Sequence, residues 1–257
     1  MKTVYGPVSS WRLGKSLGID VISVGKICSF DCVYCQLGAK DEMTVRRAKF
    51  VKPELIQTDL SEALAALTEG DVDVITFSGM GEPTLASNLG EVVEMVRGIT
   101  DVPLAILTNS SFLHLHEVRT TLQKIDKVVA KLDAPNAAVL KKINRPHPSI
   151  SFKTILEGIK EFRRVYEGEF ELQMIFIDEN KRHVEELVSH AAELKPDRVE
   201  INTPLRHCPV EPLDTEEIKD IKDIFEEKGL ATISVYEAGE LEVKSINYKE
   251  TVRRRPE

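Results

Sequence analysis

Residues 72–83 read VDVITFSGMGEP. The first seven positions, 72–78, form a short and mostly apolar run that is typical of a strand buried on both faces of a parallel sheet. The next five, 79–83, form a glycine-rich turn. Such a turn most often connects a strand to a helix, and its lack of side chains also lets a backbone approach a ligand closely. We therefore expect a strand followed by a turn that is either structural or ligand-binding.

The same alternation of strand and helix continues along the chain. It predicts βα units with right-handed crossovers, and hence an α/β fold. No G-x-G-x-x-G follows the first predicted strand, which disfavours a dinucleotide-binding sheet. The sequence therefore predicts a partial TIM barrel of the (β/α)6 type. Strands are expected at 20–24, 72–78, 104–109, 128–133, 171–177, 198–202 and 232–236, and helices at 54–67, 89–96, 113–123, 152–166, 184–194 and 216–227.

The length and the absence of linkers favour a single domain. The 257 residues suit a barrel-type α/β fold built as one unit. No stretch is rich enough in Pro, Gly or Ser to divide the chain. We expect one domain over 1–257, with a core at about 18–236, an N-terminal segment at 1–17 and a C-terminal extension at 237–257.

Composition limits the classes of partner. The 34 Lys and Arg against 42 Asp and Glu give a net charge of −8, which disfavours non-specific binding to nucleic acid. The three arginines at 253–255 are expected to be solvated. No apolar run approaches the roughly 18 residues that cross a bilayer, so no membrane partner is expected. Residues 1–7 lack the apolar part of a signal peptide, which predicts a cytoplasmic location.

Three of the four cysteines lie close together in residues 28–35, which read CSFDCVYC. The thiols of a cytosolic protein stay reduced, so metal binding or redox chemistry is favoured over disulfides. A structural zinc site would need a fourth ligand nearby. A [4Fe-4S] cluster held by Cys28, Cys32 and Cys35 would instead leave one iron open to an outside ligand. The alternative without metal is three buried thiols.

This C-x3-C-x2-C run, with Tyr34 just before the last cysteine, resembles the cluster-binding loop of the radical SAM superfamily. The resemblance implies a partial barrel that holds one [4Fe-4S] cluster and binds S-adenosylmethionine (SAM) at the open iron. It further implies that an electron donor of the flavodoxin or ferredoxin type reduces the cluster. Reductive cleavage of SAM then gives methionine and a 5′-deoxyadenosyl radical.

The glycine-rich turn supports this resemblance, since residues 78–83 look like the GGEP-type motif of the family, with Met80 inside it. The resemblance implies that Gly79, Gly81, Glu82 and Pro83, together with Tyr34 of the cysteine loop, bind the cofactors. Backbone carbonyls or the Glu82 carboxylate can accept hydrogen bonds from the ammonium group of the methionine moiety of SAM.

Polar residues at the ends of later strands are further candidates, because the chemistry of a barrel lies where its βα loops converge. Lys131 suits a carboxylate such as that of SAM, since an inward-facing ammonium group needs an anion. For the other positions, cofactor binding and a satisfied structural hydrogen bond are both open. These candidates are Asn109, Asp133, Gln173 and Asn202.

Residues 5–14, 16–18, 143–146 and 201–204 resemble a branch of the superfamily related to tRNA wyosine synthases. Arg12 and Arg145 carry fork-shaped donors suited to phosphate or carboxylate, or to a salt bridge that ties a loop to the barrel. Wyosine synthases carry a second cluster upstream, and no cysteine precedes Cys28 here. The remaining thiol, Cys208, is a catalytic candidate as a hydrogen-atom donor, an auxiliary metal ligand with His207, or an inert loop residue.

Three functions remain open at this point. The first is a radical SAM enzyme that acts on a small molecule or an RNA nucleoside such as one in tRNA. The second is an activating enzyme or peptide modifier that generates a radical on a partner protein. The third is a non-enzymatic iron–sulfur electron carrier, which would normally close every iron with protein ligands.

Overall fold

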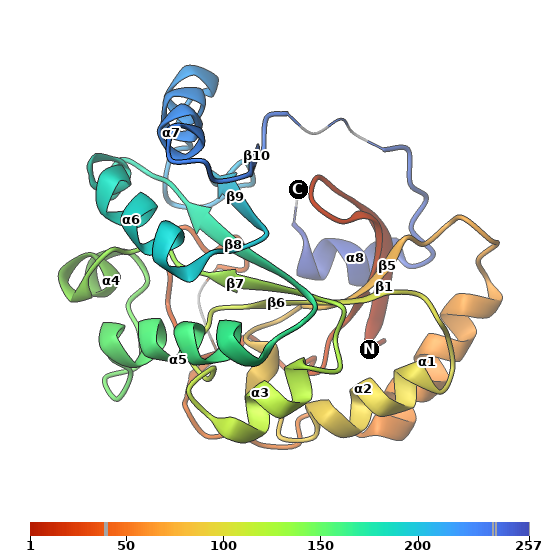
Figure 1. Cartoon of the computed structure of the whole chain (residues 1–257). Coiled ribbons are helices and arrows are strands. Elements are labelled where there is room, and N and C mark those ends of the chain that lie inside the picture. The colour runs from red at the N-terminus through yellow and green to blue at the C-terminus, as the bar shows by residue number, and fades with distance from the viewer. Residues whose placement is uncertain (39–40, 238, 240, 257) are drawn as a thin grey trace.

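The computed structural model describes residues 1–38, 41–237, 239 and 241–256, and its centre is one curled sheet. The sheet has eight strands in the order β1-β2-β5-β6-β7-β8-β9-β10. Neighbours from β2 to β10 pair in parallel, whereas β1 and β2 form an antiparallel hairpin. Figure 1 shows the sheet bent into an open half-barrel with helices on its outer side. The predicted α/β fold of the partial-barrel type is therefore confirmed.

The strands supply the inner wall of the half-barrel. A separate two-stranded ribbon, β3 with β4, carries the first cysteine. The bounds are β1 Val4–Ser10, β2 Gly14–Ile19, β3 Ile27–Cys28, β4 Glu42–Met43, β5 Val74–Phe77, β6 Leu104–Thr108, β7 Lys127–Lys131, β8 Glu169–Ile175, β9 Arg198–Asn202 and β10 Thr232–Ser234.

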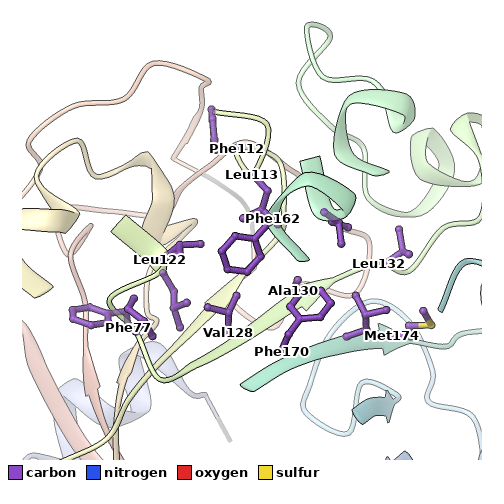
Figure 2. Packing of buried hydrophobic residues seen from close by; sticks show 14 of the residues in the cluster. Phe77, Phe112, Leu113, Leu122, Val128, Ala130, Leu132, Phe162, Phe170 and Met174 are labelled. Carbon is purple, nitrogen blue, oxygen red and sulfur yellow. The ribbon is translucent and has the colours of Figure 1, made fainter. Parts of the chain in front are cut away.

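Helices cover the outer face because their apolar sides bury against the sheet. Phe162 on α5 packs edge-on against Phe170 on β8, with ring centroids 6.0 Å apart, and Val128 and Ala130 of β7 lie beside them (Figure 2). The helices are α1 Pro53–Ala65, α2 Leu89–Arg97, α3 His116–Leu122, α4 Ala137–Ile143, α5 Phe152–Val165, α6 Val184–Leu194, α7 Thr215–Glu227 and α8 Tyr248–Arg254, with two 3-10 turns at Pro83–Leu85 and Lys181–His183.

The first predicted strand, at 20–24, is wrong. The strand in this part of the chain is β2, which ends at Ile19, before the predicted range begins. Directly after it, the Asp20 carboxylate accepts the backbone N–H groups of Ile22 and Ser23 at 3.0 and 2.9 Å, and this bends the chain out of the strand. Strand β1 was not predicted, since a Gly-Pro pair interrupts its apolar pattern. It is an edge strand with a register shift between Tyr5 and Val8, which is where a sheet accepts proline.

Two short helices, α4 and α8, also escaped prediction. Each has seven residues, which is too short for a helical period to stand out. By contrast, local chemistry that is visible in the sequence marks the starts of two longer helices. Pro53 occupies the first turn of α1, and Asp214 forms a capping box with Glu217 at the start of α7.

The C-terminal arginines are not solvated as a group, which corrects the prediction for 253–255. Arg253 is exposed, but Arg254 is buried and pairs with Asp20, which directly follows β2. Helix α8 lies beside β1 (Figure 1), and the Gly6 N–H donates to the Thr251 hydroxyl at 3.0 Å. Within the described residues, no helix is both long and apolar enough to cross a membrane.

Candidate active site

A cavity of about 750 Å³ opens at the carboxyl ends of the strands. It has the size range of small-molecule and cofactor sites. Most of the predicted site residues line it, although they come from six separate segments of the chain. These are Cys28, Cys32, Tyr34, Cys35, Gly79, Gly81, Glu82, Asn109, Lys131, Gln173 and Asn202.

The cysteine loop is held against residues 143–146. The Val33 N–H donates to the Ile143 carbonyl at 2.9 Å, and the Cys35 N–H donates to the Cys32 carbonyl at 3.1 Å. Two amide groups point at the thiols, since Nδ2 of Asn144 lies 3.5 Å from the Cys32 sulfur and Nδ2 of Asn109 lies 3.6 Å from the Cys28 sulfur. These backbone hydrogen bonds hold the loop in place, and the sulfurs of Cys28 and Cys32 each accept an N–H group.

The chemistry of these thiols fits an iron–sulfur cluster. All four cysteines of the chain are free, and Cys28, Cys32 and Cys35 face one cavity. Within the described residues, no three His, Cys, Asp or Glu side chains surround a single-ion point. A cubane cluster does not require such a point, because each cysteine binds a different iron. N–H donors to cysteine sulfur are a recognised means of tuning such clusters.

Burial controls the protonation of the thiols. It raises the pKa of Cys28 to about 12, with the nearby Glu82 carboxylate as the second cause. It also raises the pKa of Cys32, against the opposing charge of Lys131. Metal binding displaces the thiol protons, so loading of this site depends on pH.

The glycine-rich turn continues β5 and runs alongside β3. Ile27 forms a parallel bridge with Gly81, its N–H donates to the Met80 carbonyl at 3.0 Å, and its carbonyl accepts from the Glu82 N–H at 3.2 Å. A Cβ at Gly81 would lie 1.7 Å from the Ile27 carbonyl oxygen. Only glycine permits this approach, which joins the turn to the residue next to Cys28.

Glu82 is buried and fixes the turn. Its Oε1 accepts from the N–H and hydroxyl of Thr84 at 3.1 and 2.6 Å and from the Thr108 hydroxyl at 2.7 Å. Its Oε2 accepts from the Asn109 N–H at 2.6 Å. Burial raises the pKa of Glu82, and these hydrogen bonds act to lower it. Three of these donors meet Oε1 and one meets Oε2, so Oε2 keeps an acceptor position that a ligand ammonium could use.

A second polar group joins the cysteine loop to β7. Asp133 accepts from the Tyr34 hydroxyl, and its Oδ2 also accepts from Asn144 at 2.9 Å. The Lys131 ammonium lies 3.3 Å from this oxygen and 4.6 Å from the centre of the Tyr34 ring. Burial acts to lower the pKa of Lys131, but the charges of Asp133 and Cys32 outweigh the effect of burial, so the pKa of Lys131 is raised. Lys131 therefore stays charged where it faces the cavity.

An ion pair crosses the open side of the half-barrel. Arg12, in the turn of the β1–β2 hairpin, lies 3.2 Å from Oε2 of Glu200 on β9. The Gln173 amide donates to the same oxygen at 3.3 Å. Deeper in the barrel, Glu171 lies beside Glu200, and burial together with that neighbour raises the pKa of Glu171 to about 8. The predicted salt bridge of Arg12 is thus present. Arg145 is exposed, and its backbone φ is 44°.

Three predicted site residues are not among the described residues that line the cavity. Pro83 begins a 3-10 turn. Asp133 does not line the cavity, but it contacts Tyr34 and Lys131, which do. The Cys208 thiol donates to the Val210 carbonyl at 3.2 Å, in the loop after β9. The structure therefore does not bring Cys208 to the other candidates.

Other residues at the site were missed. Asn144 was part of a quoted motif but not of the predicted site, because its contacts to Cys32 and Asp133 depend on the tertiary fold. Arg206 and Arg255 line the cavity from the loop after β9 and from the end of α8. Their signal in the sequence was charge alone, which does not distinguish a cavity from a surface.

Residues 22–191 match the radical SAM superfamily, a span that includes the cysteine loop, the glycine-rich turn and the strands from β3 to β8. The chain belongs to this superfamily. A radical SAM protein is an enzyme whose cofactors are a [4Fe-4S] cluster and SAM, so the chain is an enzyme with these cofactors. The electron-carrier alternative is thereby set aside.

Several curated relatives share most of this chain. It is 40% identical to the UPF0026 protein of Synechocystis over 81% of this chain and 77% of that one, and it belongs to the UPF0026 group. It is also 40% identical to the UPF0026 protein of Methanocaldococcus jannaschii, over 80% and 64% of the two chains. The GTPase Obg of Brachyspira hyodysenteriae is 39% identical over 88% of this chain, which spans 34% of that protein. The chain thus spans less than two thirds of two of these relatives.

Solved radical SAM structures share the fold. SuiB of Streptococcus suis bound to S-adenosylmethionine superposes with a TM-score of 0.62 over 84% of this chain and 49% of that one, at 15% identity. The same protein bound to its precursor peptide SuiA gives a TM-score of 0.64 over 84% and 48%. At this identity the likeness concerns the fold alone.

Proposed function

We propose that Cys28, Cys32 and Cys35 hold the [4Fe-4S] cluster and that SAM occupies the cavity above the glycine-rich turn. The observation that carries this proposal is that three cysteines and the Gly81 turn, from separate segments, line one cavity at the carboxyl ends of the strands. When bound, the cluster and SAM would supply a 5′-deoxyadenosyl radical for hydrogen-atom abstraction from the substrate.

The residues of this chain position and enclose the reaction. Backbone carbonyls of the turn suit the ammonium group of SAM, and the charged Lys131 suits its carboxylate. The Asn109 and Asn144 amides donate to the cysteine sulfurs.

The substrate we favour is a small molecule. The probable GTP 3′,8-cyclase of Methanothermobacter thermautotrophicus, whose name gives it a small-molecule nucleotide substrate, is 27% identical over 60% of this chain and 42% of that one. An RNA nucleoside remains an alternative substrate, because residues 5–14 and 143–146 resemble the wyosine synthase branch. An electron donor of the flavodoxin or ferredoxin type and a cytoplasmic location, where thiols stay reduced, suit the chemistry.

A peptide substrate is the second candidate. SuiB, which shares this fold, was solved with a precursor peptide. An enzyme of that kind would form 5′-deoxyadenosine in the presence of a partner protein and would leave the modification on the partner. The small-molecule candidate predicts instead that 5′-deoxyadenosine takes up deuterium from a low-molecular-weight fraction of an extract made from deuterium-labelled cells.

The test is anaerobic. The protein is reconstituted with iron and sulfide, reduced with dithionite and mixed with SAM, and 5′-deoxyadenosine is measured together with the EPR spectrum. We expect a cluster signal that changes on addition of SAM and a slow release of 5′-deoxyadenosine. Replacing Cys32 by Ala should abolish that release, whereas Cys208→Ala should keep the bound iron. A stable cluster whose signal ignores SAM would contradict the proposal.

A further inference from the structure

Three arginines from separate segments line one side of the cavity: Arg12 from the hairpin turn, Arg206 from the loop after β9, and Arg255 from the end of α8. We infer that they form a binding site for a phosphate group of a small-molecule substrate. The inference rests on the proposed function, because the molecule that carries the phosphate is taken to be the substrate of the proposed radical SAM reaction.

The charge of the cavity is opposite to that of the chain. The chain as a whole carries −8, yet the described lining residues include a single carboxylate, Glu82, which accepts four hydrogen bonds from the protein. Three of the lining cations pair with a carboxylate that does not line the cavity, since Lys131 pairs with Asp133, Arg254 with Asp20 and Arg12 with Glu200. The cationic lining residues are Arg12, Lys131, Arg206, Arg254 and Arg255.

Arg206 and Arg255 have no carboxylate partner within the described residues. Arg206 donates to the side-chain carbonyl of Gln36 at 2.9 Å, a neutral acceptor. Burial, together with repulsion from Arg206 and Arg12, lowers the pKa of Arg255 to about 10. Burial and the charge of Arg12 likewise lower the pKa of Arg206. Buried like charges of this kind are costly unless an anion joins them.

Arg12 contributes both an anchor and a free donor. Its guanidinium lies 4.8 Å from the centre of the Trp11 ring, and one of its terminal nitrogens pairs with Glu200. Its Nε is buried and finds no acceptor in the part of the chain that the structure describes. A buried donor without an acceptor costs free energy, which an anion in the cavity would recover.

The number and shape of these donors favour phosphate over carboxylate. Planar guanidinium groups match phosphate oxygens in paired hydrogen bonds. A phosphate monoester brings about 1.5 to 2 negative charges at neutral pH, which suits two arginines without counter-ions, whereas a carboxylate brings one. SAM itself carries a net positive charge, so it does not satisfy them.

The site also lies close to the reacting centre. Gln36, the partner of Arg206, directly follows Cys35 in the cysteine loop. Arg206, Gln36 and Cys35 all line the same cavity. A phosphate held by the arginines therefore places the remainder of the substrate in the space that the cluster loop and the glycine-rich turn share.

The test measures anion binding to the reconstituted full chain by isothermal titration calorimetry. Phenyl phosphate and benzoate share the same ring and differ in the anion, so they separate phosphate from carboxylate recognition. We expect phenyl phosphate to bind at least tenfold more tightly. Arg206→Gln and Arg255→Gln should each weaken phenyl phosphate binding about tenfold or more, the loss of a charged hydrogen bond. Arg255→Lys should retain part of the affinity.

The matched control is Arg253→Gln, because Arg253 is exposed on the same helix and does not line the cavity. It should bind phenyl phosphate like the parent protein. Equal affinity for the two anions, or an equal loss in the control and in Arg255→Gln, would overturn the inference. The parent protein is also assayed for 5′-deoxyadenosine. Its absence would refute the proposed function, whereas its formation without phenyl phosphate binding would refute the phosphate site alone.

Discussion

Nε of Arg254 lies 2.7 Å from Oδ2 of Asp20, and both side chains are buried. The same Asp20 oxygen accepts from the Met80 N–H at 3.2 Å in the glycine-rich turn. Arg254 also donates to the Lys2 carbonyl at 2.8 Å and the Ser23 hydroxyl at 2.7 Å. One arginine on α8 therefore joins the start of the chain, the end of β2 and the turn that lines the cavity.

Replacing Arg254 by Met should lower the free energy of unfolding by about 3–5 kcal/mol, because it leaves the Asp20 carboxylate buried without its partner. Urea denaturation followed by circular dichroism measures this. Arg253→Met is the control, since a change at that exposed neighbour should stay within about 0.5 kcal/mol. A loss below about 1 kcal/mol for Arg254→Met would show that the pair is not a stabilising link.

Replacing Gly81 by Ala should force the turn away from β3, because the new Cβ would lie 1.7 Å from the Ile27 carbonyl oxygen. We expect a lower melting temperature and less iron bound per chain after reconstitution. Gly98→Ala is the matched control, since Gly98 has φ −73° at the end of α2 and its Cβ would be no closer than 3.4 Å to a neighbour. Equal iron content in the two variants would show that the close approach is dispensable.

The buried pair of Glu171 and Glu200 should make stability fall as pH rises. The pKa of Glu171 is raised to about 8 in the folded chain, so the folded state binds its proton more tightly than the unfolded state. This contribution is complete below the unfolded pKa of roughly 4.5 and is lost as pH rises to about 8. Urea titrations at pH 6 and pH 8 should show a decrease on the order of 1–2 kcal/mol.

Glu171→Gln is the informative variant for that pH dependence, because the amide keeps a hydrogen-bond donor and cannot lose a proton. We expect the decrease between pH 6 and pH 8 to shrink in this variant. An unchanged pH dependence would mean that another group is responsible.

Replacing Glu82 by Gln should destabilise the chain by about 1–3 kcal/mol, because the amide NH2 would face one of the four donors that the carboxylate accepts. The displaced turn should also raise the SAM concentration needed for 5′-deoxyadenosine release. The exposed Glu227→Gln serves as control for the loss of one negative charge. Full stability in Glu82→Gln with weaker SAM binding would instead assign the carboxylate to the ligand.

Local signals predicted the parts of the site that one segment carries. The spacing of Cys28, Cys32 and Cys35 and the turn at Gly81 depend on residue type and order, so they are visible in the sequence. The strands β5 to β10 were also found, because buried parallel strands are short continuous apolar runs.

The remaining features depend on contacts between distant segments. The strand at Gly14–Ile19 was missed because glycines and serine dilute its apolar pattern, and its end is set by the side chain of Asp20. The positions of Asn144, Arg206 and Arg255 at the cavity follow from loops and helix ends that only the folded barrel brings together. Their residue types alone are equally compatible with an exposed surface.

The link from Arg254 to Asp20 also bears on the order of events during synthesis. Domains fold as units while the chain emerges from its N-terminus onward. Strand β2 and the glycine-rich turn emerge early, but they await a partner that the ribosome makes more than 230 residues later, since Asp20 and Arg254 are 234 positions apart. The cavity wall, and with it the proposed site for iron and sulfide, is therefore completed only after α8 has emerged and Arg254 has reached Asp20.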